Sequence, residues 1–183
     1  AVFLTHYHGD HACGAARIRA ASGCAVYAPA AEAKAIEEGD EDATSIAISK
    51  GGLYPADFVY PKCPGVVGLD DGEEVTLGAV TLAAHMVPGH SLCDMVLHGT
   101  VDGRRCLFTG DSVFVCGQVL IQSLHDVSIH PYACAMGKLA ALEVDALFPG
   151  HGVFCLEKGG VHVQTAAAKF ASGLIPPQLY YFA

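Results

Sequence analysis

The most constraining feature of this chain is residues 5–11, which read T-H-Y-H-G-D-H directly after four apolar residues. This segment holds four side chains that can bind a metal, His6, His8, Asp10 and His11. In an extended segment the two outer histidines of H-x-H point the same way, because side chains alternate with a period of two. Gly9 then permits a turn that directs the last two ligands to a second position. The pattern predicts a strand that delivers a dinuclear metal site at its carboxyl end.

Three later segments each place one further ligand-type residue beside glycine, at the end of an apolar run typical of a strand. They are Val87-Pro88-Gly89-His90-Ser91, Phe108-Thr109-Gly110-Asp111-Ser112 and Phe148-Pro149-Gly150-His151-Gly152. Strand ends that meet at one rim are a common way to assemble a site on a rigid sheet. We therefore expect His90, Asp111 and His151 to complete the metal site.

In this order the four motifs resemble the metallo-β-lactamase superfamily of hydrolases, and its glyoxalase II-like branch in particular, over residues 5–152. The resemblance implies an α/β (α+β) chain folded as a four-layer αβ/βα metallo-β-lactamase sandwich. Members carry early strands and a helix before the first motif, so the resemblance also implies an N-terminally truncated form of this fold. If nothing replaces those strands, a sheet edge is exposed.

The resemblance also assigns the ligands. The first metal would lie on His6, His8 and His90, the second on Asp10, His11 and His151, and Asp111 would bridge them. Two divalent ions are expected, with zinc first and iron or manganese as alternatives. Such ions lower the pKa of a bridging water from about 15.7 toward 7 and polarise a carbonyl oxygen. Asp10 and Asp111 are the candidate catalytic residues, and Asp111 would orient the bridging hydroxide and carry its proton.

The implied reaction is hydrolysis of a small thioester or ester, as in hydroxyacylglutathione hydrolases. The bridging aspartate argues against a β-lactamase, because lactamases of this fold generally lack it. Two other branches fit imperfectly: glyoxalase II-like enzymes carry a basic residue soon after T-G-D, yet residues 112–128 contain no Lys or Arg, and lactonases have tyrosine where this chain has Phe114. A lactonase, a mononuclear iron sulfur dioxygenase-like enzyme and an inactive scaffold that binds a partner strand at a sheet edge stay open as alternatives.

Several segments near the motifs allow two interpretations. The apolar residues that follow Asp111 could form either core or a pocket for an acyl group; they are Val113, Phe114, Val115, Val119, Leu120, Ile121 and Leu124. Residues 39–65, with Tyr54, Phe58 and Tyr60, are a candidate lid, whereas Tyr180 and Tyr181 are expected to anchor the tail. His125 is a candidate substrate contact, and the remaining histidines are expected to have ordinary structural roles.

Composition favours one enzyme-sized domain, residues 1–183, with 52% hydrophobic residues. The formal charge of −9 disfavours nucleic acid and anionic membranes as partners and leaves a small-molecule substrate, while the oligomeric state stays open. No apolar run approaches the roughly 20 residues that span a bilayer. The eight scattered cysteines are expected to be reduced, buried small hydrophobes in a cytoplasmic protein, with Cys116 in the core.

Apolar periodicity and turn residues predict the secondary structure. Strands are expected over residues 1–5, 24–27, 73–77, 80–86, 94–98, 105–109 and 144–148. Helices are expected over residues 12–21, 29–38, 129–142 and 160–172. Residues 73–109 should form an antiparallel meander that turns at Asp102-Gly103, and Ser128 should cap the helix that follows.

Overall fold

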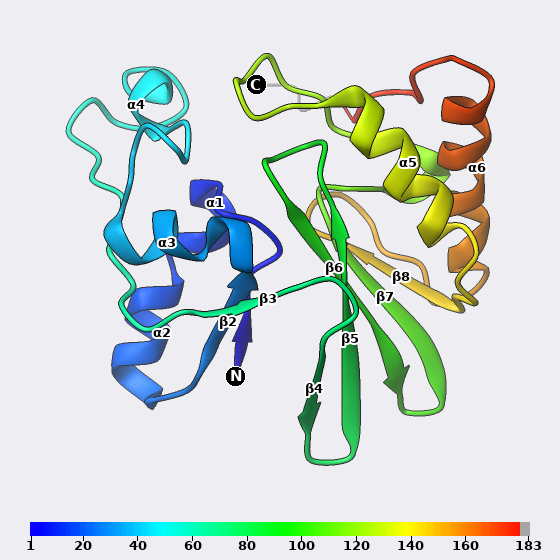
Figure 1. The fold of residues 1–183 in the computed structure, drawn as a ribbon, viewed down its shortest axis with the longest axis horizontal. Coiled ribbons are helices and arrows are strands. Elements are labelled where there is room, and N and C mark those ends of the chain that lie inside the picture. Colours follow the sequence, from blue (N-terminus) through cyan, green and yellow to red (C-terminus); the bar gives the residue numbers. More distant parts are fainter. Residues whose placement is uncertain (180–183) are drawn as a thin grey trace. The chain divides into compact units, whose positions relative to one another are not determined.

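The computed structural model describes residues 1–179, which form two compact units, residues 1–69 and residues 70 onward (Figure 1). Each unit is described by itself, and the expectation of a single domain stays a prediction. Tyr180 and Tyr181 lie outside the described residues. No helix within residues 1–179 is long and apolar enough to cross a membrane.

The first unit is built on a parallel three-stranded sheet in the order β1-β2-β3. The strands are β1 (Val2–Phe3), β2 (Val26–Pro29) and β3 (Val67–Leu69), and the helices are α1 (Gly9–Ala12), α2 (Ala15–Ser22), α3 (Ala30–Glu38) and α4 (Ile46–Ser49). Parallel pairing needs crossover connections, which the helical segments between the strands provide. Val26, Ala28 and Ile36 are fully buried in the core of this unit.

The second unit is a five-stranded sheet in the order β4-β5-β6-β7-β8. Its strands are β4 (Glu74–Leu77), β5 (Val80–Val87), β6 (Asp94–Val101), β7 (Arg104–Gly110) and β8 (Ala146–Pro149). The short 3₁₀ helix η1 (Val115–Gly117) and the helix α5 (Ile129–Leu139) lie between β7 and β8, and the helix α6 (Gly159–Ala171) follows β8. The first four strands are antiparallel, and β8 runs parallel to β7. Both long helices cover the same face of this sheet (Figure 1).

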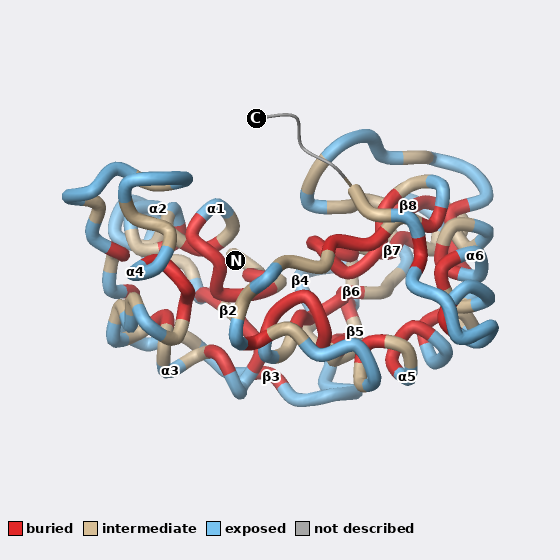
Figure 2. Tube along the Cα trace, turned by 90° about the horizontal axis from the view of Figure 1, so that it is seen from above, coloured by how far each residue is buried: buried red, intermediate tan, exposed pale blue. Residues whose placement is uncertain are grey.

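The core of the second unit lies between its sheet and these two helices. Val96, Leu107 and Leu147 of the strands are fully buried in this core. Tyr132 and Met136 of α5 belong to the same core. Figure 2 shows the buried positions running along the strands of this sheet. The rigid sheet therefore fixes where each strand ends.

Most predicted elements are confirmed, including the antiparallel meander and its turn at Asp102-Gly103, where both residues have positive φ. Ser128 occupies the N-cap position of α5, but its side chain makes no capping hydrogen bond. That helix ends at Leu139, three residues earlier than predicted. The helix expected over residues 12–21 begins later, at Ala15, as α2. The pattern did not predict α1, β3, α4 or η1, which are only three or four residues long and offer too few positions for a periodic signal.

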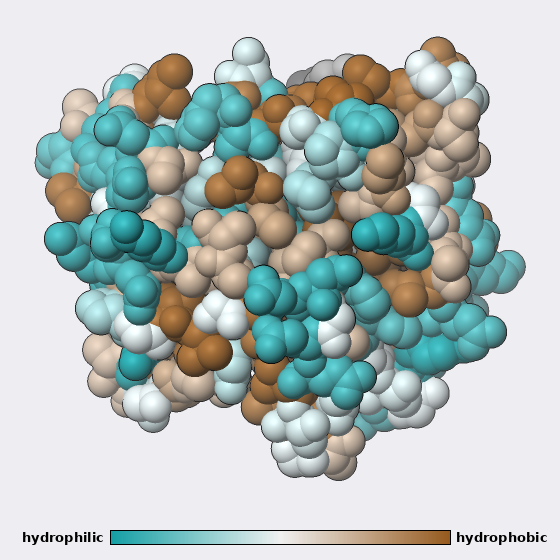
Figure 3. Space-filling view, viewed as in Figure 1, coloured by the Kyte–Doolittle hydropathy of each residue, from teal (hydrophilic) through white to brown (hydrophobic). Residues whose placement is uncertain are grey.

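The cysteine prediction is only partly right. All eight cysteines are free, as expected, but only Cys63 and Cys106 are buried. Cys116 and Cys134 are exposed, so the expected core position of Cys116 is wrong. The reason is local: Cys116 lies in a tight turn with φ of 65°, which directs its side chain outward. On the face shown in Figure 3, polar and apolar side chains alternate over the surface.

Candidate metal centre

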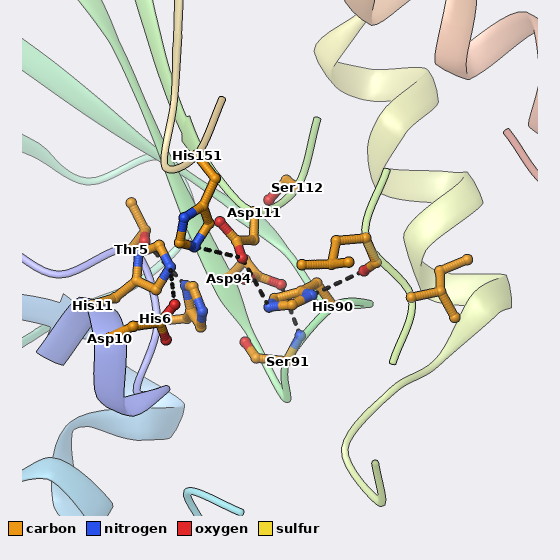
Figure 4. Close-up of polar contacts among 12 residues, drawn as sticks. Thr5, His6, Asp10, His11, His90, Ser91, Asp94, Asp111, Ser112 and His151 are labelled. Carbon is orange, nitrogen blue, oxygen red and sulfur yellow. Dashed lines mark hydrogen bonds and ion pairs between the residues drawn. The ribbon is translucent and has the colours of Figure 1, made fainter. Parts of the chain in front are cut away.

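The first unit presents four candidate ligands after β1: His6 and His8 precede α1, whereas Asp10 and His11 lie within it. The His6 ring lies 4.7 Å from the His8 ring and 4.2 Å from the His11 ring, measured between ring centroids. Nε2 of His11 lies 3.5 Å from Oδ2 of Asp10. His6 is fully buried, whereas half of the Asp10 side chain is exposed. The residues that the H-x-H-x-D-H motif singles out therefore gather at one point of this unit; Figure 4 shows His6, Asp10 and His11.

Glycine is required at position 9, the first residue of α1, because another segment of the same unit packs directly against it. A Cβ atom at position 9 would lie 2.7 Å from the Tyr54 hydroxyl and 2.9 Å from Cδ1 of Ile46. Tyr60 is buried, and Tyr54 and Phe58 pack against the same core. These aromatic residues pack residues 39–65 against the core of the first unit, and the candidate lid stays a prediction.

The second unit presents three candidate ligands at one edge of its sheet. β5, β7 and β8 run in the same direction, because β5 and β7 are both antiparallel to β6 and β8 is parallel to β7. His90, Asp111 and His151 follow the carboxyl ends of these three strands. Oδ2 of Asp111 lies 3.5 Å from Nε2 of His90 and 3.5 Å from Nε2 of His151 (Figure 4).

The hydrogen bond of His90 fixes which of its ring nitrogens can bind a metal. Nδ1 lies 2.9 Å from the carbonyl oxygen of Leu120. A carbonyl oxygen only accepts, so Nδ1 carries the hydrogen, and in the neutral ring the lone pair is on Nε2, the atom that faces Asp111. This arrangement is typical of metal-binding histidines, whose second nitrogen donates to a backbone carbonyl. Nδ1 of His6 lies 3.1 Å from the Thr5 hydroxyl. In the tautomer in which this Nδ1 donates, the lone pair of His6 is also on Nε2.

The spacing of these atoms fits a divalent metal. Ligand bonds of about 2.0–2.1 Å in tetrahedral geometry place neighbouring ligand atoms about 3.3–3.4 Å apart. The two separations around Asp111 and the separation between Asp10 and His11 are each 3.5 Å. An imidazole lone pair and a carboxylate oxygen repel each other at this distance unless a proton or a cation lies between them. Imidazole and carboxylate are also the ligand types that zinc, iron and manganese share.

Tyr132 of α5 connects the loops of two of these ligands, although no sequence pattern pointed to it. Its hydroxyl donates to the carbonyl oxygens of Asp111, at 3.3 Å, and of Ser112. Its ring packs on Gly89, the residue before His90, where a Cβ atom would lie 2.3 Å from Cγ of the ring. Burial raises the pKa of Tyr132 well above its ordinary value, so the hydroxyl stays protonated and able to donate.

Most of the other residues that the sequence analysis named as pocket or contact candidates lie in structural positions. Val113 and Val119 belong to the core of the second unit, with Val115 and Ile121 packed against it, and Phe114 and Leu120 are buried. The core interpretation of this segment therefore holds. His162 accepts a hydrogen bond from the Cys116 backbone, His98 lies 3.1 Å from the Glu143 carbonyl oxygen, and His125 is exposed.

Comparison with known proteins identifies the family of the chain. The sequence model of the metallo-beta-lactamase superfamily matches residues 1–151. The chain belongs to the metallo-β-lactamase superfamily. Among its curated relatives, the hydroxyacylglutathione hydrolase of Hyphomonas neptunium is 31% identical over 64% of this chain and 36% of its own length. The hydroxyacylglutathione hydrolase of Cereibacter sphaeroides is 27% identical over 97% of this chain and 64% of its own. The lactamase-like protein nscB of Arthroderma otae is 28% identical over 82% and 34%.

This metallo-β-lactamase superfamily member thus spans between 34% and 64% of the length of those three relatives. Solved structures show the same fold. A subclass B3 metallo-β-lactamase of Bradyrhizobium japonicum superposes with a TM-score of 0.68 at 24% identity, covering 93% of this chain and 69% of that one. A metallo-β-lactamase of Cronobacter sakazakii gives 0.67 at 22% identity, covering 93% and 73%. The expected metallo-β-lactamase fold is confirmed, and with it a superfamily of metal-dependent hydrolases.

Proposed function

We propose that this protein is a dinuclear metal-dependent hydrolase of small thioesters or esters, with its two ions on the ligands that the sequence motifs assign. One ion would be held by His6, His8 and His90. The other would be held by Asp10, His11 and His151. Asp111 would be shared between them. Zinc is the expected metal, with iron or manganese as alternatives.

One observation carries this proposal: a single carboxylate oxygen, Oδ2 of Asp111, lies 3.5 Å from the imidazole nitrogens of both His90 and His151. These two histidines are assigned to different ions, so a carboxylate between them is placed to serve both. The relatives named as hydroxyacylglutathione hydrolases support the thioester part of the proposal.

When bound, divalent ions lower the pKa of water and polarise a carbonyl oxygen. The chain's own residues supply position and proton transfer. Asp111 is almost fully buried and its backbone is held by Tyr132, so its carboxylate keeps one orientation and can align the attacking water. Asp10, half exposed, can take the proton that this water releases and pass it to solvent.

The balanced reaction is simple hydrolysis. The oxygen of water forms a bond to the acyl carbon, and the carbon–sulfur or carbon–oxygen bond breaks. One proton of the water goes to the leaving thiol or alcohol, and the other is released from the carboxylic acid product. No redox partner is required, which distinguishes this reaction from the dioxygenase alternative.

The test combines metal analysis with hydrolysis of an uncharged thioester. The expected result is about two divalent ions per chain, the number typical of dinuclear hydrolases. A chelator should remove the activity, and zinc should restore it. His90→Ala should lower both metal content and activity, whereas His130→Ala, an exposed histidine on α5, should change neither. One redox-active iron per chain, or full activity in the His90 variant, would contradict the proposal.

A further inference from the structure

In the first unit, two buried side chains hold the backbone of Tyr7, the residue between His6 and His8. The Tyr7 N–H donates to Oε2 of Glu32 at 2.7 Å, and the Tyr7 carbonyl oxygen accepts from the hydroxyl of Tyr60 at 2.8 Å. Both bonds join residues distant in the chain, Glu32 in α3 and Tyr60 in the segment before β3. We name Glu32 and Tyr60 together the Tyr7 clamp.

The burial of this clamp is unusual for its chemistry. Glu32 is 0% exposed, Tyr60 1% and Tyr7 2%. Glutamate is almost never fully buried unless it is paired, because removing a carboxylate from water is costly. Burial also raises the pKa of Tyr60 far above its ordinary value, so the phenol keeps its proton and donates. One contact of the buried Glu32 carboxylate is with the backbone N–H between two candidate metal ligands.

The position of Tyr7 determines where the two neighbouring imidazoles point. His6 and His8 are separated by one residue, so a rotation of either peptide plane of Tyr7 turns one histidine away from the other. Tyr7 itself lies between two elements, since β1 ends at Phe3 and α1 begins at Gly9. Because the clamp binds the N–H and the carbonyl oxygen of Tyr7, it fixes both planes.

We propose that Glu32 and Tyr60 are positioning residues for the metal centre, acting through Tyr7 to hold His6 and His8 in ligand geometry. This inference rests on the proposed function, because it concerns the ion assigned to those two histidines. Neither residue belongs to the ligand motifs. The expected consequence is selective: loss of the clamp weakens one of the two metal-binding steps more than the other.

The experiment measures zinc affinity by competition with a chelating dye and records the visible spectrum of the cobalt-substituted protein, so no activity assay is involved. Glu32→Ala should weaken the step that involves His6 and His8 about 10–100-fold, the usual effect of removing an outer-shell partner. Tyr60→Phe deletes one oxygen atom and should weaken the same step about tenfold. Glu32→Gln keeps an acceptor for the Tyr7 N–H and should retain most of the affinity.

Ile36→Val is the matched control, because Ile36 is a fully buried core residue one turn further along α3. It should lower the melting temperature without changing zinc affinity or the cobalt spectrum.

The failure of this proposal and the failure of the proposed function give different results. If the parent protein binds no metal, the proposed function is wrong; if the parent binds two ions and both Glu32→Ala and Tyr60→Phe bind them equally well, the positioning role is wrong. A Glu32→Gln loss equal to that of Glu32→Ala would also overturn positioning through the hydrogen bond. Should Glu32→Ala not fold, Tyr60→Phe decides.

Discussion

Replacing Gly89 with alanine should destabilise the second unit and displace His90. An added Cβ would lie 2.3 Å, 2.4 Å and 2.7 Å from Cγ, Cβ and Cδ1 of Tyr132, whereas ordinary contacts of a Cβ atom begin near 3.4 Å. The Tyr132 ring cannot move aside, because it is fully buried, lies 5.4 Å from the Phe170 ring and donates to two carbonyl oxygens. The backbone at position 89 must therefore shift.

The overlap exceeds 1 Å with rigid atoms, so we expect a cost at the upper end of the range for overpacked cores, about 3 kcal/mol. For a chain of this size such a loss lowers the melting temperature by about 6–12 °C. Because position 89 adjoins His90, the same shift should weaken zinc binding. Thermal unfolding followed by circular dichroism, with and without zinc, measures both effects.

Gly137→Ala is the matched control. Gly137 lies on the exposed side of α5 with nothing within 4 Å of an added Cβ, so alanine should stabilise the helix by about 0.5–1 kcal/mol. That gain should raise the melting temperature by about 1–4 °C. If Gly89→Ala melts within about 2 °C of the parent protein, a shift that corresponds to about 1 kcal/mol at most, the steric argument is refuted.

Three further predictions concern catalysis, substrate and pH. Asp111→Asn should lower turnover of a thioester at least about a hundredfold while leaving KM nearly unchanged; steady-state kinetics that show near-normal turnover with both metals bound would contradict this. Because residues 112–128 contain no Lys or Arg, kcat/KM should be higher for an uncharged thioester than for the glutathione thioester of the same acyl group. A preference for the glutathione thioester that Lys158→Ala abolishes would contradict this substrate prediction. Burial, and then the neighbouring His98, lower the pKa of His85, so the unfolded chain binds more protons and stability should fall as pH drops below about 6.5. Melting curves between pH 5 and pH 7.5 should show a weaker decline in His85→Gln, and parallel curves would argue against this role.

The ligands could be predicted from the sequence because each one is tied to a local rule. His6 and His8 could be identified from the H-x-H spacing that follows an apolar run, although the strand ends earlier than expected, at Phe3, and Gly9 begins α1. His90, Asp111 and His151 each follow an apolar strand, and strands that run in one direction present their ends at one edge. The long strands and helices were found for the same reason, since each contains several periods of its hydrophobic pattern.

The groups that hold the ligands in place could not be predicted in this way, because their contacts join residues far apart in the chain. Glu32 meets Tyr7 across 25 positions, Tyr60 meets it across 53, and Tyr132 meets Asp111 across 21. In sequence, Glu32 is one acidic residue in the first turn of an alanine-rich helix, where a carboxylate usually serves the helix dipole in water. Its complete burial reverses that interpretation, and the backbone N–H beside two histidines gives the reason. The sequence motif therefore states which side chains can bind metal, while tertiary contacts to the backbone between them decide whether their nitrogens converge.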